Sequence, residues 1–376
     1  MERYLKETLI EDLGEKMVFL GGPRQVGKTI LALSLLAGGN ETHPAYLNWD
    51  NPAARRMLLQ GALPGGERLV ILDEIHKYKG WRNLVKGFYD TNKSSRQFLI
   101  TGSARLDHYR RGGDSLQGRY HYHRLHPLSL YEISRRPTRA DLDHLLQFGG
   151  FPEPFIKGQA RHWKRWQREH QSRIIHEDLI SLEHVKEVSQ LDLLVQTLPE
   201  RVGALLSINN LRQDLSVAFE TADRWITILE NLYFCFRIHP YGLPKLRAAA
   251  KERKVYMWDW STCKNPSARF ENLVASNLLK HCHRIEDRDG DRMELRFVRD
   301  SQGRELDFVV VRNGKPDFAV ECKTGEQQLS RNISYFSRRT NIPKYYQVHM
   351  GSKDYEIAEH KARILPLATM AGILAI

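Results

Sequence analysis

The segment that decides the fold of this chain is Gly21–Thr29, GGPRQVGKT, which lies between the apolar run Met17–Leu20 and the helix-forming segment Ile30–Leu36. The spacing G-x-x-x-x-G-K-T between a predicted strand and a predicted helix is typical of a loop that binds phosphate groups. Glycines let backbone N–H groups turn toward phosphate oxygens, and the helix N-terminus adds the positive end of its dipole. The predicted nucleotide-binding residues here are Gly22, Pro23, Arg24, Gln25, Val26, Gly27, Lys28, Thr29 and Ile30.

Four side chains have predicted roles in ATP chemistry. We expect Lys28 to reach the β- and γ-phosphates of ATP and the Thr29 hydroxyl to bind Mg²⁺. Downstream, Arg68–Glu74 (RLVILDE) reads as a buried parallel strand that ends in two carboxylates. Asp73 is predicted to hold Mg²⁺ through water, and Glu74 to polarise the attacking water. A residue in the role of Glu74 distinguishes a hydrolase from a nucleotide-binding switch.

Two further strands are predicted, at Ala45–Asp50 and Gln97–Ser103, and the second ends in hydroxyl side chains. Thr101 or Ser103 is expected either to sense the nucleotide from this strand end or to cap the following helix. Strands that alternate with helices predict an α/β fold, a doubly wound parallel sheet with its ligand at the carboxyl ends of the strands.

Composition limits the alternatives. The chain has 376 residues, 57 Lys+Arg against 45 Asp+Glu, a net charge of +12 and 36 aromatic residues, which predicts several globular domains and excludes a disordered chain. The four cysteines do not form a disulfide framework. No apolar run approaches the ~18 residues that span a bilayer, so we expect a cytoplasmic protein without a membrane partner. The basic excess is spread over the chain and has no basic tail, so by itself it does not establish a nucleic-acid partner.

Five segments together resemble an AAA+ ATPase, and more narrowly the prokaryotic ATP-binding proteins in which an AAA core precedes a C-terminal domain of unknown function. They are GGPRQVGKT, LVILDEIHKYKGW, FLITGSARL, LQGRYHYHRLHPLSLYE and FGGFPEPF. The resemblance implies an oligomeric ATPase, a hexameric ring being one form, with an AAA core at 1–135 and a helical lid at 136–190. It makes Arg119 an arginine finger that acts on a neighbouring subunit; the alternative is an ordinary salt-bridged surface arginine.

The middle of the chain predicts helices with two possible uses. Residues 159–183 read as one long helix that carries four cations on one face, at Arg161, Lys164, Arg165 and Arg168, either a rail for phosphates or a solvated face. Residues 191–260 resemble a winged helix: a second helix capped at Thr221, then a strand and a basic wing at 244–254. Such a module either reads DNA or only packs between its neighbours. Acidic residues on the second helix make it a poor surface for phosphates.

Residues 261–376 contain a predicted hairpin, Glu305–Val311 and Asp317–Lys323, joined by an Asn-Gly turn. Because side chains alternate along a strand, Glu321 and Lys323 share one face, and Asp307 approaches Glu321 from the neighbouring strand. Asp317 lies about 13 Å from Glu321 along the strand at ~3.3 Å per residue, too far to share a metal ion.

This pattern resembles the PD-(D/E)XK nucleases, in a restriction-endonuclease-like α/β domain. The resemblance implies that Asp307 and Glu321 bind Mg²⁺ or Mn²⁺ and that Lys323 positions the hydrolytic water. Glu271 corresponds to a helix glutamate of that family and would be a further metal ligand. The alternative is a binding or scaffold domain that keeps these residues without cleaving.

Two hypotheses of different classes follow. In the first, an AAA+ ATPase couples ATP hydrolysis to work on DNA, which the C-terminal domain binds or cuts. In the second, an ATP-driven switch or scaffold holds protein partners and has no nuclease activity. Glu74 favours turnover, and the set Asp307, Glu321 and Lys323 favours nucleic acid.

Overall fold

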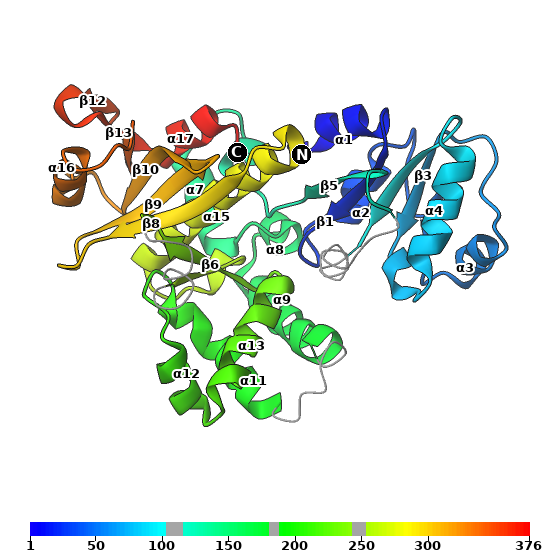
Figure 1. The fold of residues 1–376 in the computed structure, drawn as a ribbon, viewed down its shortest axis with the longest axis horizontal. Helices are drawn as coiled ribbons and strands as arrows, with labels where there is room; N and C mark the ends of the chain where they lie inside the picture. The colour runs from blue at the N-terminus through cyan, green and yellow to red at the C-terminus, as the bar shows by residue number, and fades with distance from the viewer. Residues whose placement is uncertain (103–115, 180–187, 243–252) are drawn as a thin grey trace. The chain divides into compact units, whose positions relative to one another are not determined.

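The computed structural model describes residues 1–102, 116–179, 188–242 and 253–376. Two compact units make up the chain, Met1–His126 and Pro127–Ile376 (Figure 1). Ser103, one of the two predicted nucleotide sensors, and most of the predicted basic wing at 244–254 lie outside the described residues.

The first unit is built on five parallel strands in the order β2-β3-β4-β1-β5. Their carboxyl ends therefore meet at one edge of the sheet, where the predicted phosphate loop follows β1. The predicted parallel α/β core is confirmed, and β5 is a strand that the sequence analysis did not predict. The strands are β1 (Met17–Gly21), β2 (Tyr46–Asn48), β3 (Leu69–Asp73), β4 (Gln97–Thr101) and β5 (Tyr120–Arg124).

Helices cover this sheet through regularly spaced apolar residues. In α4, Trp81, Val85 and Phe88 recur at helical spacing and join the core beside Phe19, whose ring lies 5.9 Å from that of Trp81. The α3 helix begins where the Asn51 side chain accepts backbone N–H groups of the first turn. The helices of this unit are α1 (Lys6–Leu13), α2 (Lys28–Leu33), α3 (Pro52–Leu59), the short η1 (Ile75–Lys77) and α4 (Trp81–Asn92).

The second unit contains an eight-stranded mixed sheet in the order β12-β13-β11-β10-β9-β8-β6-β7. The predicted hairpin is present, and its turn residues Asn313 and Gly314 have φ angles of 51° and 82°, as this turn requires. Strands β6 and β7 come from the region predicted as a winged helix, yet they extend the C-terminal sheet, so that sheet crosses the predicted boundary at 260/261. The strands are β6 (Cys235–Pro240), β7 (Lys254–Met257), β8 (Met293–Arg299), β9 (Glu305–Arg312), β10 (Lys315–Lys323), β11 (Tyr345–His349), β12 (Tyr355–Ile357) and β13 (Ala362–Pro366).

The helices of the second unit differ in two places from the predictions. The long helix predicted at 159–183 ends its α-helical part at Arg173 and continues as a π-helical turn. The second helix of the winged-helix-like region begins at Phe219, not after a cap at Thr221. The helices are α6 (Leu130–Ile133), α7 (Arg139–Phe148), α8 (Pro152–Lys157), α9 (Ala160–Arg173), η2 (Ile174–Leu179), α11 (Val188–Thr197), η3 (Leu198–Arg201), α12 (Ile208–Leu215), α13 (Phe219–Asn231), η4 (Trp260–Thr262), α15 (Pro266–Asp289), α16 (Arg331–Ser337), η5 (Ala358–His360) and α17 (Leu367–Leu374).

Among the described helices, none combines the length and the apolar character that a bilayer crossing requires. Even α15, with 24 residues, carries many charged side chains.

Candidate functional site

The predicted phosphate loop connects β1 to α2 and has the backbone that its glycines allow. Gly22 and Gly27 have φ angles of 134° and 97°, a region that other residues rarely adopt. Space is a second requirement at Gly22, because a Cβ there would lie closer than 3.0 Å to the carbonyl oxygen of Leu125. The loop therefore packs directly against the backbone that follows β5, and only glycine fits this position.

Lys28, the first residue of α2, folds back over the loop. Its ammonium group is buried and donates to the carbonyl oxygens of Gly22, at 2.9 Å, and Pro23, at 2.7 Å. These contacts hold a positive charge inside the loop, beside the N-terminus of α2, where both features favour an anion.

Asp73, at the end of β3, is the centre of a hydrogen-bond network. Thr29 donates to one of its carboxylate oxygens at 3.1 Å, and Thr101, at the end of β4, donates to the other. The structure thus brings together three residues that the sequence analysis predicted separately. Tyr46, from β2, also donates to Asp73 at 2.6 Å and was not predicted. Burial, together with the neighbouring Asp73, raises the pKa of Tyr46 well above its ordinary value.

Glu74 follows Asp73 directly and has a left-handed backbone, with φ at 58°. Its N–H group donates to the carbonyl oxygen of Thr101, which fixes the end of β3 against β4. Its carboxylate lies 3.4 Å from Lys77 and 3.7 Å from His76. The strained backbone turns this side chain out of the strand direction, a conformation that is common at functional sites.

Arg119, the predicted finger, immediately precedes β5 and so lies at the amino ends of the parallel strands. Its guanidinium group makes a two-point contact with Asp90 of α4, at 2.8 Å and 3.3 Å. A role on a neighbouring subunit requires that it leave Asp90.

The C-terminal carboxylates gather where β9 and β10 pair. The antiparallel register places Phe308 opposite Val320, so the next pair along is Asp307 and Glu321. The Cys322 N–H group donates to Asp307 at 2.7 Å, and Lys323 contacts Glu321 at 2.9 Å. This confirms the predicted geometry of the hairpin. Asp317 is exposed on the distant part of β10, as predicted.

Glu321 is the most buried acid of this group, with 3% of its surface exposed. One carboxylate oxygen accepts hydrogen bonds from Lys323 and from the Ser330 hydroxyl, whereas the other has no partner among the described residues. Gln347 lies beside Glu321 in the register with β11 and accepts the Ser330 N–H group at 2.7 Å. An unpartnered buried oxygen is costly, which makes it a place where a cation would bind.

Glu271 reaches the same group from α15, but its carboxylate contacts Tyr256, at 2.8 Å, and Lys254, at 3.8 Å. Burial, with the charges of Glu271 and Glu321, raises the pKa of Asp307 well above its ordinary value. In the part of the chain that the structure describes, no three His, Cys, Asp or Glu side chains are placed to hold a metal ion together. The predicted ligands Glu271, Asp307 and Glu321 are therefore neighbours without a complete set of metal contacts.

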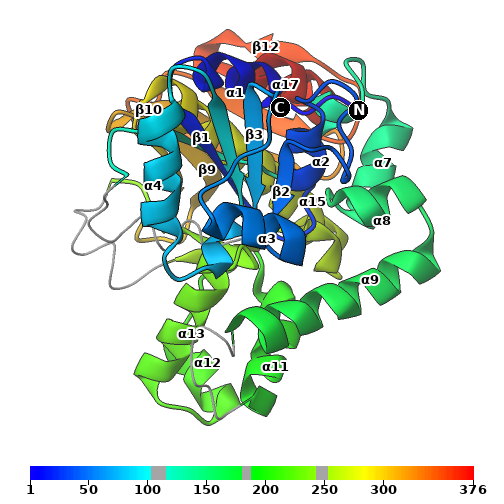
Figure 2. The same cartoon turned by 90° about the vertical axis from the view of Figure 1, so that its right-hand side faces the viewer.

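The α9 helix carries its predicted cations on an exposed face (Figure 2). No hydrogen bond or ion pair to a described residue engages them, although many other arginines of this unit are paired with acids. The opposite face is fixed: the Trp163 indole N–H and Gln167 both donate to Ser261. The exposed cations are Arg161, Lys164, Arg165 and Arg168.

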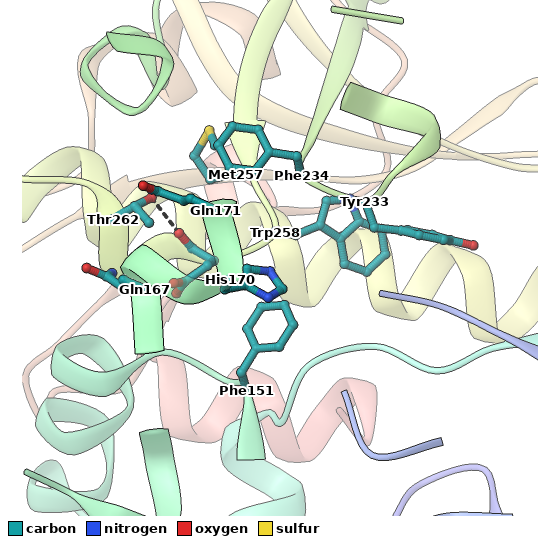
Figure 3. A pocket seen from close by; sticks show the side chains of 10 residues that line it. Phe151, Gln167, His170, Gln171, Tyr233, Phe234, Met257, Trp258 and Thr262 are labelled. Atoms are coloured by element: carbon teal, nitrogen blue, oxygen red, sulfur yellow. Dashed lines mark hydrogen bonds between the residues drawn. The ribbon is translucent and has the colours of Figure 1, made fainter. Parts of the chain in front are cut away.

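Phe151, from the segment predicted to begin the lid, lines a small pocket with His170, Tyr233 and Trp258 (Figure 3). Its ring lies 5.1 Å from that of His170, which stacks on Trp166. These aromatic contacts explain why α9 holds its orientation within this unit.

Three family models match consecutive parts of the chain. Residues 14–134 match an AAA domain, residues 139–265 match a domain of unknown function (DUF8612) and residues 267–370 match another domain of unknown function (DUF4143). The five-stranded parallel sheet and the phosphate loop agree with the first match. The first unit contains an AAA domain. Its nucleotide-binding fold is that of the AAA+ P-loop proteins.

Relatives with known sequences are distant. An uncharacterized protein of Mycobacterium tuberculosis is 25% identical over 335 residues, which cover 84% of this chain and 72% of that protein. An uncharacterized protein of Methanocaldococcus jannaschii is 21% identical, over 92% of this chain and 83% of that protein.

Two solved structures are similar at low TM-scores. The Aeropyrum pernix Orc1 protein in complex with DNA has a TM-score of 0.34 and 13% identity, over 73% of this chain and 93% of that one. The Thermotoga maritima RuvB Holliday junction branch migration motor has a TM-score of 0.31 and 18% identity, over 62% and 88%.

Proposed function

We propose that this protein is an ATPase that binds ATP with Mg²⁺ at the phosphate loop and hydrolyses it. The network around Asp73 carries the proposal, because it joins Thr29 of the loop to Thr101 of the neighbouring strand. In this arrangement Thr29 and Asp73 would hold Mg²⁺, a hard cation that prefers such oxygen donors. Lys28 would bind the phosphates, and Glu74 would orient the attacking water.

The test is phosphate release from ATP by the full chain with Mg²⁺, together with binding of a fluorescent ATP analogue. Lys28→Met should lose binding, and Glu74→Gln should keep binding and lose turnover. Lys79→Met, an exposed lysine of the same unit, is the matched control and should leave both unchanged. Turnover at the wild-type rate in Lys28→Met or in Glu74→Gln would contradict the proposal.

The proposed partner of the ATPase is DNA, bound through the exposed face of α9. Its four cations recur over about 10 Å of helix at ~1.5 Å per residue, and the fixed inner face keeps them pre-oriented. Cations without acidic partners lose no ion pair when they bind phosphates. Replacing all four with alanine should weaken DNA binding and reduce the slope of log K against log salt by up to ~3.6, about 0.9 per lost contact. An unchanged slope would exclude α9.

Self-association is proposed with the DNA partner. In an oligomer, a hexameric ring being one form, Arg119 would leave Asp90 and contact the nucleotide of a neighbouring subunit. Mixing Arg119→Ala with Glu74→Gln chains tests this idea, because a finger acting on the neighbour restores turnover in mixed assemblies. Turnover that equals the sum of the separate variants would contradict it.

A second candidate function is metal-dependent cleavage of DNA at Asp307, Glu321 and Lys323, and the unpartnered oxygen of Glu321 favours it. The competing proposal is a scaffold that binds protein partners. Labelled duplex, branched and single-stranded DNA with Mg²⁺ or Mn²⁺ separates the two. Cleavage that disappears in Asp307→Ala and Lys323→Ala supports the nuclease, and no cleavage by the wild type supports the scaffold.

A further inference from the structure

A lysine from outside the nuclease-like region reaches its carboxylates. Lys254 begins β7, and 3% of its side chain is exposed. Its ammonium group forms an ion pair with Glu305, lies 3.8 Å from a carboxylate oxygen of Glu271, and lies 5.5 Å from the centre of the Phe297 ring. A buried ammonium group in such a place is stable only because carboxylates surround it.

The same strand encloses Glu271 from a second position. Tyr256, two residues along β7 and therefore on the same face, donates its hydroxyl to Glu271 at 2.8 Å. Gly203, with φ at 77°, covers the carboxylate so closely that a Cβ there would lie 2.9 Å from one oxygen and 3.1 Å from the other. Its N–H group donates to the Val255 carbonyl, which ties this cover to β7. Glu271 is thus held by residues of the preceding region and faces away from the remaining acids.

The charges of the site divide into two parts. Lys254 serves Glu305 and Glu271, whereas Lys323 serves Glu321. The buried second oxygen of Glu321 has no partner among the described residues. One part of the site is thus neutralised by a lysine, and the other keeps an oxygen available to a cation.

We propose that Lys254 is a built-in cation that competes with a divalent metal ion for this carboxylate site, so that β7 controls metal binding. An ammonium group and a divalent ion repel each other at such distances, and Glu271 completes a set of oxygen ligands only when Lys254 and Tyr256 release it. The inference rests on the carboxylate site proposed above but does not require cleavage of DNA. Metal binding and cleavage are measured separately, so one can fail without the other.

The experiment measures Mn²⁺ binding to the full chain without nucleotide, by the electron paramagnetic resonance signal of free Mn²⁺. Lys254→Met removes the charge and keeps the aliphatic stem, and should bind Mn²⁺ at least about tenfold more tightly than the wild type. Lys254→Arg keeps the charge and should resemble the wild type. Lys264→Met, at an 82%-exposed lysine paired with Glu200, is the surface control. The gain should disappear in Lys254→Met/Glu321→Gln, which assigns the ion to this site.

Loss of the ammonium group leaves Glu305 without its partner and destabilises the fold. Lys254→Met/Glu305→Gln removes both charges together, so it should fold and show the same gain in Mn²⁺ affinity. Its melting temperature should rise with Mn²⁺ by more than that of the wild type, because a ligand stabilises the state that binds it. Equal Mn²⁺ affinity in the wild type and both Lys254 variants, or a gain that survives Glu321→Gln, would overturn the proposal.

Discussion

The Gly22→Ala substitution tests the phosphate loop through its geometry. The added Cβ would meet the Leu125 carbonyl oxygen at a distance that real Cβ atoms do not adopt, and would lie 3.3 Å from the carbonyl carbon and the nitrogen of the same residue. All three are backbone atoms, which cannot rotate away. The Leu125 N–H group is also held, because it donates to the Gly21 carbonyl at 2.9 Å. The loop itself must therefore move.

The size of the effect follows from these distances. A displacement of about half an ångström brings the contact to the tolerated limit of 3.0 Å. That is comparable with the tolerance of ~0.5 Å within which a binding site must be held. In addition, a φ of 134° suits glycine alone and costs another residue about 1–3 kcal/mol. We expect ATP affinity to fall at least about tenfold, which corresponds to ~1.4 kcal/mol.

The assay is titration with a fluorescent ATP analogue, combined with thermal unfolding in its absence. Gly38→Ala is the matched control, because Gly38 also has a positive φ, of 66°, but no atom of the described residues lies within 4 Å of the position that an added Cβ would occupy. This control should lose about 1 kcal/mol of stability and keep its ATP affinity. Gly22→Ala with the affinity of the wild type would refute the argument, as would equal losses of affinity in both variants.

Three further predictions concern buried polar groups. Thr101→Val leaves an oxygen of Asp73 without its donor and should lower the unfolding free energy by about 1–3 kcal/mol and slow ATP turnover, measured by urea unfolding and phosphate release. Burial lowers the pKa of His281 to about 4, below its ordinary value of 6.5. The unfolded chain therefore binds more protons between these pH values, so stability should fall as pH drops from 6.5 to 4, and less so in His281→Gln. Arg237→Met should cost about 3–5 kcal/mol in urea unfolding, because it leaves the partly buried carboxylate of Glu230 unpaired.

The nucleotide site could be predicted because its signals are local in the sequence. The loop Gly22–Thr29 and the strand ending at Asp73 each carry a spacing that has one chemical use. Parallel strands then bring their carboxyl ends together, so Thr29, Asp73 and Thr101 meet without further information. The C-terminal hairpin was predictable for a similar reason, since its turn and the period of two fix the faces of Glu321 and Lys323.

The missing residues depend on pairings that are distant in the sequence. Tyr46 donates to Asp73 only because β2 lies beside β3, and a tyrosine in a strand carries no signal of that contact. Lys254 reaches Glu271 because β6 and β7 extend the C-terminal sheet, whereas the sequence pattern assigned them to another module. Strand β5 was missed because its sequence, YHYHR, lacks the apolar run of its neighbours.

The winged-helix-like region shows why charge must be assigned by contact and not by count. On α13, Asp223 and Glu230 do not form a free acidic surface: both bind Arg237, whose side chain is 5% exposed, at 3.1 Å and 2.6 Å. These acids therefore stabilise the packing of α13 on β6, and α13 offers phosphates no cationic face. The exposed cations of α9 have no such partners within the described ranges, and their helix is fixed on its inner side by Trp163 and Trp166. If the second unit binds DNA, α9 and not α13 is the element whose charges are available for it.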